Sequence, residues 1–298
     1  MTDLPLDQVR TLLTVADEGT FDAAAAALHV TPSAVSQRVK ALEQRTGRVL
    51  LTRTKPVRLT ESGQVVVRFA RRLAQLEHDA RAELGMRGAD EPVRLSIAVN
   101  ADSLATWFLP ALSRVPADPP VCFELHREDQ DHTTALLREG TVMAAVTSSA
   151  TPVQGCSVRP LGDLRFLPVA SPAFAARWLT ESQSIAEAPV VVFDRRDDLQ
   201  DRFVRGLGGG RGASGLRHYV PASEAFVEAV VAGLGWGMVP AVQAAPRLRE
   251  DRLVDLAPDR PVDVPLFWQQ WKLDSPALAA VADAVAATAA EALRGSVR

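Results

Sequence analysis

In the first sixty residues, apolar side chains recur at helical spacing in successive segments, and only short turns join these segments. This arrangement constrains the fold more than any other feature of the sequence. The first pattern ends at Gly19, and Thr20 can cap a second, alanine-rich helix over Asp22–Leu28. After a brief turn, Thr31 can cap a third helix that has Pro32 at its first position. Two helices joined in this way predict a helix-turn-helix.

The charge of the chain is divided between this segment and the rest. The overall net charge of −3 alone argues against nucleic acid as a partner. Residues 31–60, however, carry seven basic groups and one acid, whereas residues 89–298 carry 20 basic and 26 acidic groups. A basic patch on an acidic body is typical of a surface that binds a phosphate backbone. The alternative, a solvated charged face, is less favoured because the patch lies inside the motif.

The exposed positions of the third helix predict how DNA is contacted. Its first turn, with Ser33 and Ser36, suits phosphate groups, and Gln37 can reach base edges in the major groove. Two β-prone pieces, Val49–Thr52 and Val57–Thr60, predict a hairpin wing whose basic tip can enter a minor groove. A helical hairpin that merely packs is the alternative. The DNA-binding candidates are Thr31, Pro32, Ser33, Ser36, Gln37, Arg38, Lys40, Arg53 and Lys55.

The stretch from Phe21 to Gly63 resembles the DNA-binding signature of LysR-type transcriptional regulators. It contains the core AA-x-x-LHVT-x-SAVSQ-x-V-x-x-LE and a later LT-x-x-G. The resemblance implies a homodimer or homotetramer that binds double-stranded DNA at dyad-related half-sites near a promoter, with RNA polymerase as a further candidate partner.

Residues 63–88 predict a linker helix between a DNA-binding domain at 1–62 and an effector-binding domain at 89–298. Apolar residues recur there at alternating spacings of three and four, the pattern of a helix–helix seam. The seam can belong to the intramolecular core or to a partner helix, and its place between domains favours dimerisation. The seam residues are Val66, Phe69, Leu73, Leu76 and Ala80.

From Val93 onward, short strand patterns alternate with helical ones, which predicts parallel α/β units. The predicted fold class is therefore α/β, with an all-α winged helix-turn-helix domain and a linker helix in front. By its resemblance to the sensor of LysR regulators, the effector domain is expected to form two subdomains like those of periplasmic binding proteins. Subdomain I would span about 92–162 and 267–298, and subdomain II about 163–266.

Polar residues at strand ends predict a ligand site. A strand ends at Asn100, and the following helix start at Ser103 can hold a carboxylate with its free N–H groups. Taken singly, each polar residue is more simply a cap or a solvated loop acid. Together, the helix start and several acids at other strand ends suit a zwitterion with an extra cationic group.

The segments VNADSLATWFLPAL, VVFDRRDD and ASEAFVEAVVAG resemble the branch of the LysR family that contains ArgP and LysG. Members of this branch respond to lysine and arginine and control exporters of basic amino acids. In the resulting hypothesis, Ser103 and its helix start hold the effector's α-carboxylate, and an acid pairs with the side-chain cation. The effector-binding candidates are Asn100, Asp102, Ser103, Asp129, Thr147, Asp194, Ser223, Glu224 and Trp268.

Other functions are less favoured. Residues 210–215 match G-x-G-x-x-G, but a helical pattern precedes them and a β-prone one follows, which argues against a dinucleotide. Two cysteines are too few for a disulfide framework, and neither a metal-ligand nor a nucleophile pattern predicts a metal, a cofactor or an enzyme. With no signal peptide or long apolar run, a cytoplasmic location without membrane contact is expected. A transport-type binding protein, an α/β enzyme and a LysR-type sensor of an aromatic or dicarboxylic acid remain the alternatives.

Overall fold

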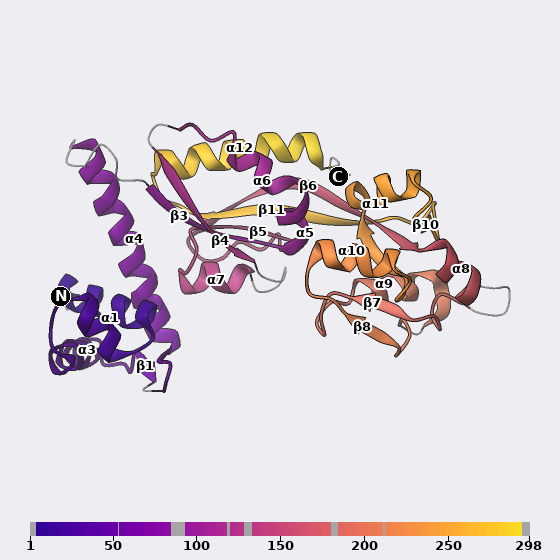
Figure 1. Cartoon of the computed structure of the whole chain (residues 1–298). Helices are drawn as coiled ribbons and strands as arrows, with labels where there is room; N and C mark the ends of the chain where they lie inside the picture. Colours follow the sequence, from indigo (N-terminus) through magenta and orange to yellow (C-terminus); the bar gives the residue numbers. More distant parts are fainter. Residues whose placement is uncertain are drawn as a thin grey trace.

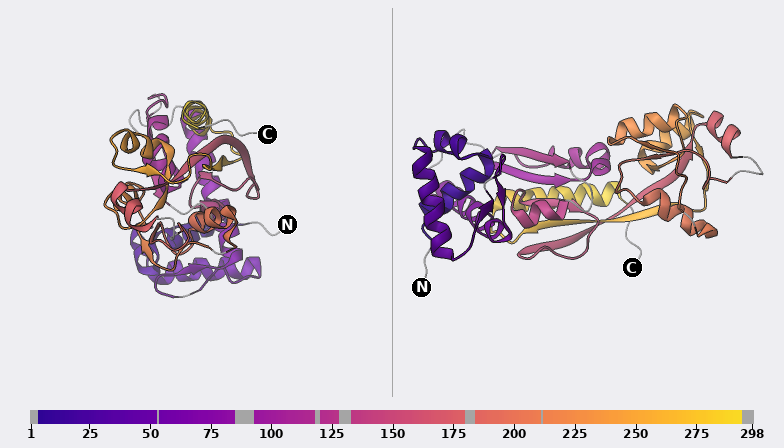
Figure 2. Two further views of the ribbon diagram at one scale, coloured as in Figure 1. Left: turned by 90° about the vertical axis from the view of Figure 1, so that its right-hand side faces the viewer. Right: turned by 90° about the horizontal axis from the view of Figure 1, so that it is seen from below.

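The computed structural model describes residues 4–52, 54–84, 93–117, 120–127, 133–179, 184–210 and 212–293. The molecule is elongated, with a small helical N-terminal domain at one end (Figures 1 and 2). A long helix leads from this domain to two α/β lobes that follow one another along the molecule. We call the described residues of 93–161 and 267–293 the first lobe and those of 162–266 the second lobe (Figure 1).

The N-terminal domain is a helix-turn-helix followed by a short hairpin. The hydroxyl oxygens of Thr20 and Thr31 each accept a hydrogen bond from the N–H three residues further on, at 3.1 and 3.2 Å. Gly19 and Gly47 end their helices in the left-handed conformation. These caps confirm the predicted helices. The elements are α1 (Leu6–Glu18), α2 (Phe21–Ala27), α3 (Pro32–Thr46), β1 (Leu51–Thr52) and β2 (Arg58–Leu59).

The long helix α4 (Glu61–Glu83) begins in the core of the N-terminal domain. There Val66 and Val67 are buried with the apolar residues of α1 and α3. Further along the same helix, the side chains of Phe69 and Leu76 are 41% and 49% exposed. The predicted seam is therefore divided, because Val66 packs within its own chain while Phe69 and Leu76 are open to another molecule.

Arginines on α4 connect the N-terminal domain to the first lobe. Arg71 forms an ion pair with Asp17 of α1 at 2.5 Å and donates a hydrogen bond to Thr141 of the first lobe at 3.2 Å. The guanidinium of Arg72 lies over the ring of Trp271, 5.3 Å from its centre. The helix is thus held against both neighbours by polar and cation–π contacts.

A single sheet passes through both lobes, with strand order β10-β6-β11-β5-β3-β4 and β9 paired to β6. Strand β3 pairs in parallel with β4 and β5, as predicted, but β6, β9, β10 and β11 pair antiparallel. The prediction of parallel units was wrong for these strands, because β6 and β11 carry the chain from one lobe to the other and back. The strands are β3 (Val93–Val99), β4 (Val121–Arg127), β5 (Ala144–Thr147), β6 (Cys156–Ala170), β9 (Gly237–Pro240), β10 (Val254–Asp255) and β11 (Val262–Trp271).

The β6–β11 pair is irregular where it passes between the lobes. Its register shifts between Leu266 and Phe267, opposite Gly162, which has a φ of +133°. Such an irregularity bends a strand pair and increases its local twist. This bend lies where the two strands pass from one lobe to the other.

Helices cover the sheet in both lobes (Figure 1). In the first lobe, a continuous helical stretch follows β3 and packs against the C-terminal helix α12. Within the described ranges, no helix is both long and apolar enough to cross a membrane. The remaining elements are α5 (Ala101–Ser103), η1 (Leu104–Phe108), α6 (Leu109–Leu112), α7 (Thr133–Glu139), α8 (Pro172–Trp178), β7 (Val190–Val192), α9 (Leu199–Val204), η2 (Arg205–Gly209), β8 (Arg217–Tyr219), α10 (Ser223–Val231), α11 (Ala241–Arg249) and α12 (Pro276–Ala292).

Candidate functional site

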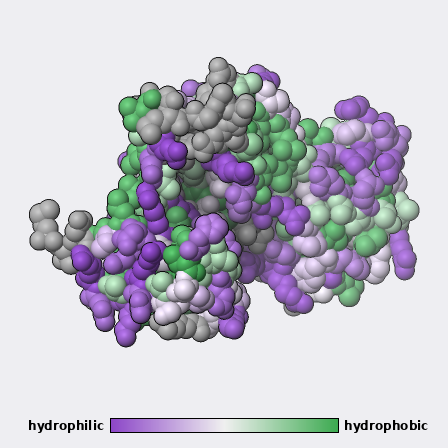
Figure 3. Space-filling model, turned by 60° about the vertical axis from the view of Figure 1, so that its left-hand side comes forward, coloured by the Kyte–Doolittle hydropathy of each residue, from purple (hydrophilic) through white to green (hydrophobic). Residues whose placement is uncertain are grey.

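The predicted DNA-contacting residues that the structure describes lie at the start and along the length of α3 and at the tip of the β1–β2 hairpin. Ser33, Gln37 and Lys40 on α3 are exposed, and so is Lys55 at the hairpin tip. Ser36 and Arg38 are half-buried beside them. Thr31 and Pro32 form the start of α3, and Arg53 lies outside the described residues. Hydrophilic side chains cover most of the face of this domain that comes forward in Figure 3.

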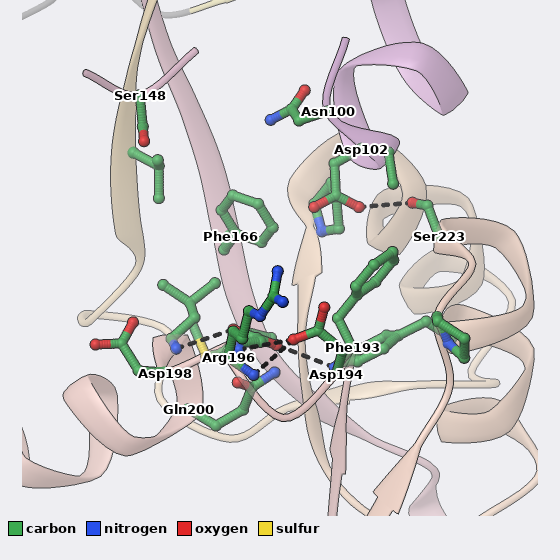
Figure 4. Close-up of a pocket in the computed structure, with 18 of the residues that line it drawn as sticks. Asn100, Asp102, Ser148, Phe166, Phe193, Asp194, Arg196, Asp198, Gln200 and Ser223 are labelled. Atoms are coloured by element: carbon green, nitrogen blue, oxygen red, sulfur yellow. Dashed lines mark hydrogen bonds between the residues drawn. The ribbon is translucent and has the colours of Figure 1, made fainter. Parts of the chain in front are cut away.

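A second candidate site is a cavity of about 550 Å³ between the two lobes (Figure 4). From the first lobe, Asn100 and Asp102 line it where β3 passes into α5. From the second lobe, the loop after β7 and the start of α10 line the opposite side. Phe166 on β6 and Val264 on β11 add apolar wall from the two strands that connect the lobes.

Asp102 connects the lobes across this cavity. Its Oδ1 accepts a hydrogen bond of 2.7 Å from the hydroxyl of Ser223, the first residue of α10. Burial raises the pKa of Asp102 to about 6; the hydrogen bond from Ser223 opposes this increase, while the negative charges of Asp197 and Glu224 add to it. No cation among the described residues forms a salt bridge with Asp102. Its carboxylate is thus held in a position where a bound cation would be stabilised.

Asn100 caps the helix that begins beside it. Its Oδ1 accepts a hydrogen bond of 3.1 Å from the N–H of Ser103. The Nδ2 group of Asn100 is buried and has no hydrogen-bond partner among the described residues. The helix start predicted to hold a carboxylate therefore already uses the Ser103 N–H internally, and the Ser103 side chain is fully buried outside the cavity lining.

The acids of the loop after β7 serve largely to shape that loop. Asp194 Oδ1 accepts hydrogen bonds from the N–H groups of Arg196 and Asp197, at 2.7 and 3.1 Å. Both carboxylate oxygens of Asp197 accept backbone N–H groups, at 3.0 Å each. Asp198 pairs with Arg202 at 3.0 Å. Asp194 lines the cavity, as its place in the sequence suggested, and its Oδ1 is engaged by its own loop.

Besides Ser103, three more of the predicted effector contacts lie away from the cavity. Thr147 is fully buried on β5, and its neighbour Ser148 lines the cavity instead. Trp268 packs in the core, 2% exposed, and its indole N–H donates to Gln270 at 2.6 Å. Glu224 is exposed and outside the lining. Asp129 lies outside the described residues.

Several lining residues were not among the candidates. Some could have been found from their position after a strand, whereas others have no local signal in the sequence. The run DRRDD follows a strand, so its later members were accessible to the same strand-end reasoning that found Asp194. Phe166 and Val264 come from long antiparallel strands, and no local pattern shows which of their residues face the other lobe. The overlooked polar residues of the lining include Arg127, Ser148, Arg196, Asp197, Asp198, Gln200 and Arg202.

Comparison with known proteins identifies the architecture as a helix-turn-helix joined to a ligand-binding domain. Residues 6–64 match the family described as bacterial regulatory helix-turn-helix protein, lysR family, and residues 89–290 match the LysR substrate binding domain. These two matches span most of the chain, which therefore belongs to the LysR family of helix-turn-helix transcription regulators.

Individual relatives are similar over almost their full length. The chain is 44% identical over 288 residues to the lysine export transcriptional regulatory protein LysG of Corynebacterium glutamicum, covering 96% of this chain and 98% of that protein. The crystal structure of ArgP from Mycobacterium tuberculosis superposes with a TM-score of 0.88 at 46% identity, covering 97% and 98% of the two chains. Full-length LysG from Corynebacterium glutamicum with bound effector arginine gives a TM-score of 0.80 at 42% identity, covering 97% and 99%. The predicted fold class and family branch are confirmed.

Proposed function

We propose that this protein regulates transcription in response to lysine or arginine bound between the lobes of its effector domain, and that it controls the gene of an amino-acid exporter. The observation that carries this proposal is the Asp102 carboxylate, which lines the cavity and forms no salt bridge with a cation of the described residues. A buried carboxylate without a compensating charge favours a cationic ligand.

The charges of the cavity wall suit such a ligand. Among the described residues, four carboxylates and three guanidiniums line it, and together these groups carry one net negative charge when all are ionised. Lysine and arginine each carry one net positive charge at neutral pH. The lining charges are Asp102, Asp194, Asp197, Asp198, Arg127, Arg196 and Arg202. The named function of the lysine-export relative and the arginine bound in its structure support the same class of ligand.

The N-terminal domain supplies the DNA-binding half of the proposal. Helix α3 would enter the major groove with Gln37 at the base edges, while Lys55 at the hairpin tip contacts the backbone. The exposed apolar residues of α4, Phe69 and Leu76, would pack against a second copy, so that a dimer or tetramer reads dyad-related half-sites. We further propose that it acts in the cytoplasm and contacts RNA polymerase at the promoter.

Isothermal titration of the full-length protein tests the effector. L-arginine and L-lysine should bind, whereas benzoate and succinate, which represent aromatic and dicarboxylic effectors, should not. Absence of binding by both basic amino acids up to millimolar concentration, or tighter binding of either organic acid, would refute the proposed effector class. The family assignment and the DNA-binding role would stand unaffected by that result.

A further inference from the structure

The side chain of Asn100 has a fixed orientation that leaves a donor at the wall of the cavity. Since its Oδ1 accepts the Ser103 N–H at 3.1 Å, the other end of the amide must be the NH₂ group. The residue is only 2% exposed, and its Nδ2 has no hydrogen-bond partner among the described residues. Figure 4 shows this nitrogen turned toward the cavity, on the side of Ser148. A buried donor left without a partner is costly, so a ligand acceptor placed there would be stabilised.

The acceptor that fits beside it is a carboxylate, because Asp102 lies two residues further along the same turn. A donor and a carboxylate side by side match the α-carboxylate and α-ammonium groups of an amino acid, which are attached to one carbon atom. On the basis of the proposed function, we propose that the effector's α-carboxylate binds Asn100 and its α-ammonium group binds Asp102. Its side-chain cation then extends to Gln200 in the second lobe.

Gln200 provides the second unpaired polar group of the cavity wall. It lies on α9 in the second lobe, is 2% exposed, and its Oε1 has no hydrogen-bond partner among the described residues. In Figure 4 it lies at the opposite end of the cavity from Asn100 and Asp102. An N–H group at the end of a long cationic side chain satisfies this acceptor. The site therefore selects for a side chain long enough to reach from one lobe to the other.

The arginines of the wall are weaker candidates for holding the α-carboxylate. Arg127 and Arg196 are both exposed, so water already solvates their guanidinium groups and competes with a ligand. The Asn100 donor has no such competitor. The orientation proposed here also replaces the expectation that the helix start binds the carboxylate, since the Ser103 N–H is already occupied by Asn100.

Two charge-introducing variants of the full-length protein test the orientation by the sign of their effects. Asn100→Asp keeps the capping oxygen and the shape of the side chain but replaces the donor with a carboxylate oxygen. It should weaken L-arginine binding at least tenfold in isothermal titration. Agmatine, which is arginine without the α-carboxylate, should bind this variant as well as it binds the wild-type protein, or more tightly. That retained binding also shows that the variant is folded.

Gln200→Glu should have the opposite effect on L-arginine. It places a negative charge where the side-chain cation is expected, so binding should tighten severalfold, which misfolding cannot imitate. If Asn100→Asp tightens and Gln200→Glu weakens arginine binding, the ligand lies in the reverse orientation and the proposal is overturned. Equal losses of arginine and agmatine in Asn100→Asp would also overturn it. If the wild-type protein binds neither arginine nor lysine, the proposed function itself fails. That result differs from one in which the wild-type protein binds arginine but the variants change its affinity in the opposite direction to that expected.

Discussion

The DNA-contacting surface and the effector cavity present their polar groups in opposite ways. On α3, Ser33, Gln37 and Lys40 are exposed. In the cavity, Asn100 and Gln200 are buried, and the Nδ2 of Asn100 and the Oε1 of Gln200 have no hydrogen-bond partner among the described residues. An exposed group exchanges water for phosphate when DNA binds, so each contact adds little binding free energy. DNA affinity must therefore come from many contacts and from more than one copy of the protein. Buried groups have no water to compete, so a single one can decide whether a ligand binds.

The strongest test of this contrast is a variant that separates the copies. Leu76 on α4 is 49% exposed, and Leu76→Asp would place a charge in the proposed contact between two copies. Losing the second copy should lower affinity for a DNA duplex with two half-sites by roughly 100-fold or more, because linked binding units gain that much from one another. Arginine binding, which uses a single chain, should stay within twofold.

Analytical ultracentrifugation and binding to a duplex selected from random DNA by the wild-type protein would measure both effects. Ala74→Asp is the matched control, because Ala74 is exposed on the same helix but lies outside the apolar seam. A Leu76→Asp protein that remains dimeric would show that the copies meet elsewhere.

Asp102→Asn should reduce affinity for L-arginine by about 100-fold, the usual cost of removing one partner of a desolvated charge pair. The amide keeps the size of the side chain and can still accept a hydrogen bond from Ser223, so the lobes should stay connected. Glu224→Gln is the control. Glu224 was predicted as an effector contact but is exposed outside the cavity lining, so this substitution should change the affinity for L-arginine by less than about twofold. Calorimetry on both proteins distinguishes the two acids, and an equal loss in both would reinstate Glu224 as a contact.

The sequence predicted the N-terminal domain more closely than the effector domain because its signals are local. Thr20, Thr31 and Gly47 each begin or end a helix through bonds to residues a few positions away. In the effector domain, the pairing of Phe166 with Val262 joins residues far apart in the sequence. Nothing in either segment indicates its direction relative to the other, which is why parallel strands were expected there.

The candidate effector residues show the same limit at the scale of single side chains. Asn100, Asp102 and Ser223 were found because a strand end or a helix start marks them in the sequence. Thr147 was chosen by the same rule, but adjacent strand residues face opposite sides, and Ser148 is the one that lines the cavity. Gln200 was missed because only the packing of α9 against the rest of the second lobe determines which of its residues faces the cavity.

The pH dependence of effector binding is a smaller and independent test of the cavity. With its pKa near 6 in the free protein, Asp102 is ionised above that pH and protonated below it. A bound cation favours the ionised form, so binding releases a proton at low pH. Affinity for arginine should therefore be constant above about pH 7 and fall by up to about tenfold per unit below pH 6. Dissociation constants at pH 5, 6 and 7.5 would show this, and in Asp102→Asn the slope should disappear. A slope that persists in that variant would assign the titration to another group.

The smallest effect is expected at the hairpin tip, where Lys55 is exposed and can act on DNA only through its charge. Lys55→Ala should weaken binding to the selected duplex and to a scrambled duplex equally, by a few-fold. It should also lower the slope of log affinity against log salt concentration by about 1. Gln37→Ala should instead reduce the difference between the selected and scrambled duplexes while leaving the salt slope unchanged, because an uncharged side chain releases no counterion. Fluorescence anisotropy across a salt series measures both quantities. If Lys55→Ala lowered DNA affinity by as large a factor as Asp102→Asn lowers arginine affinity, the contrast between the two sites would be contradicted. One solvated charge among many should contribute less than one desolvated charge that acts alone.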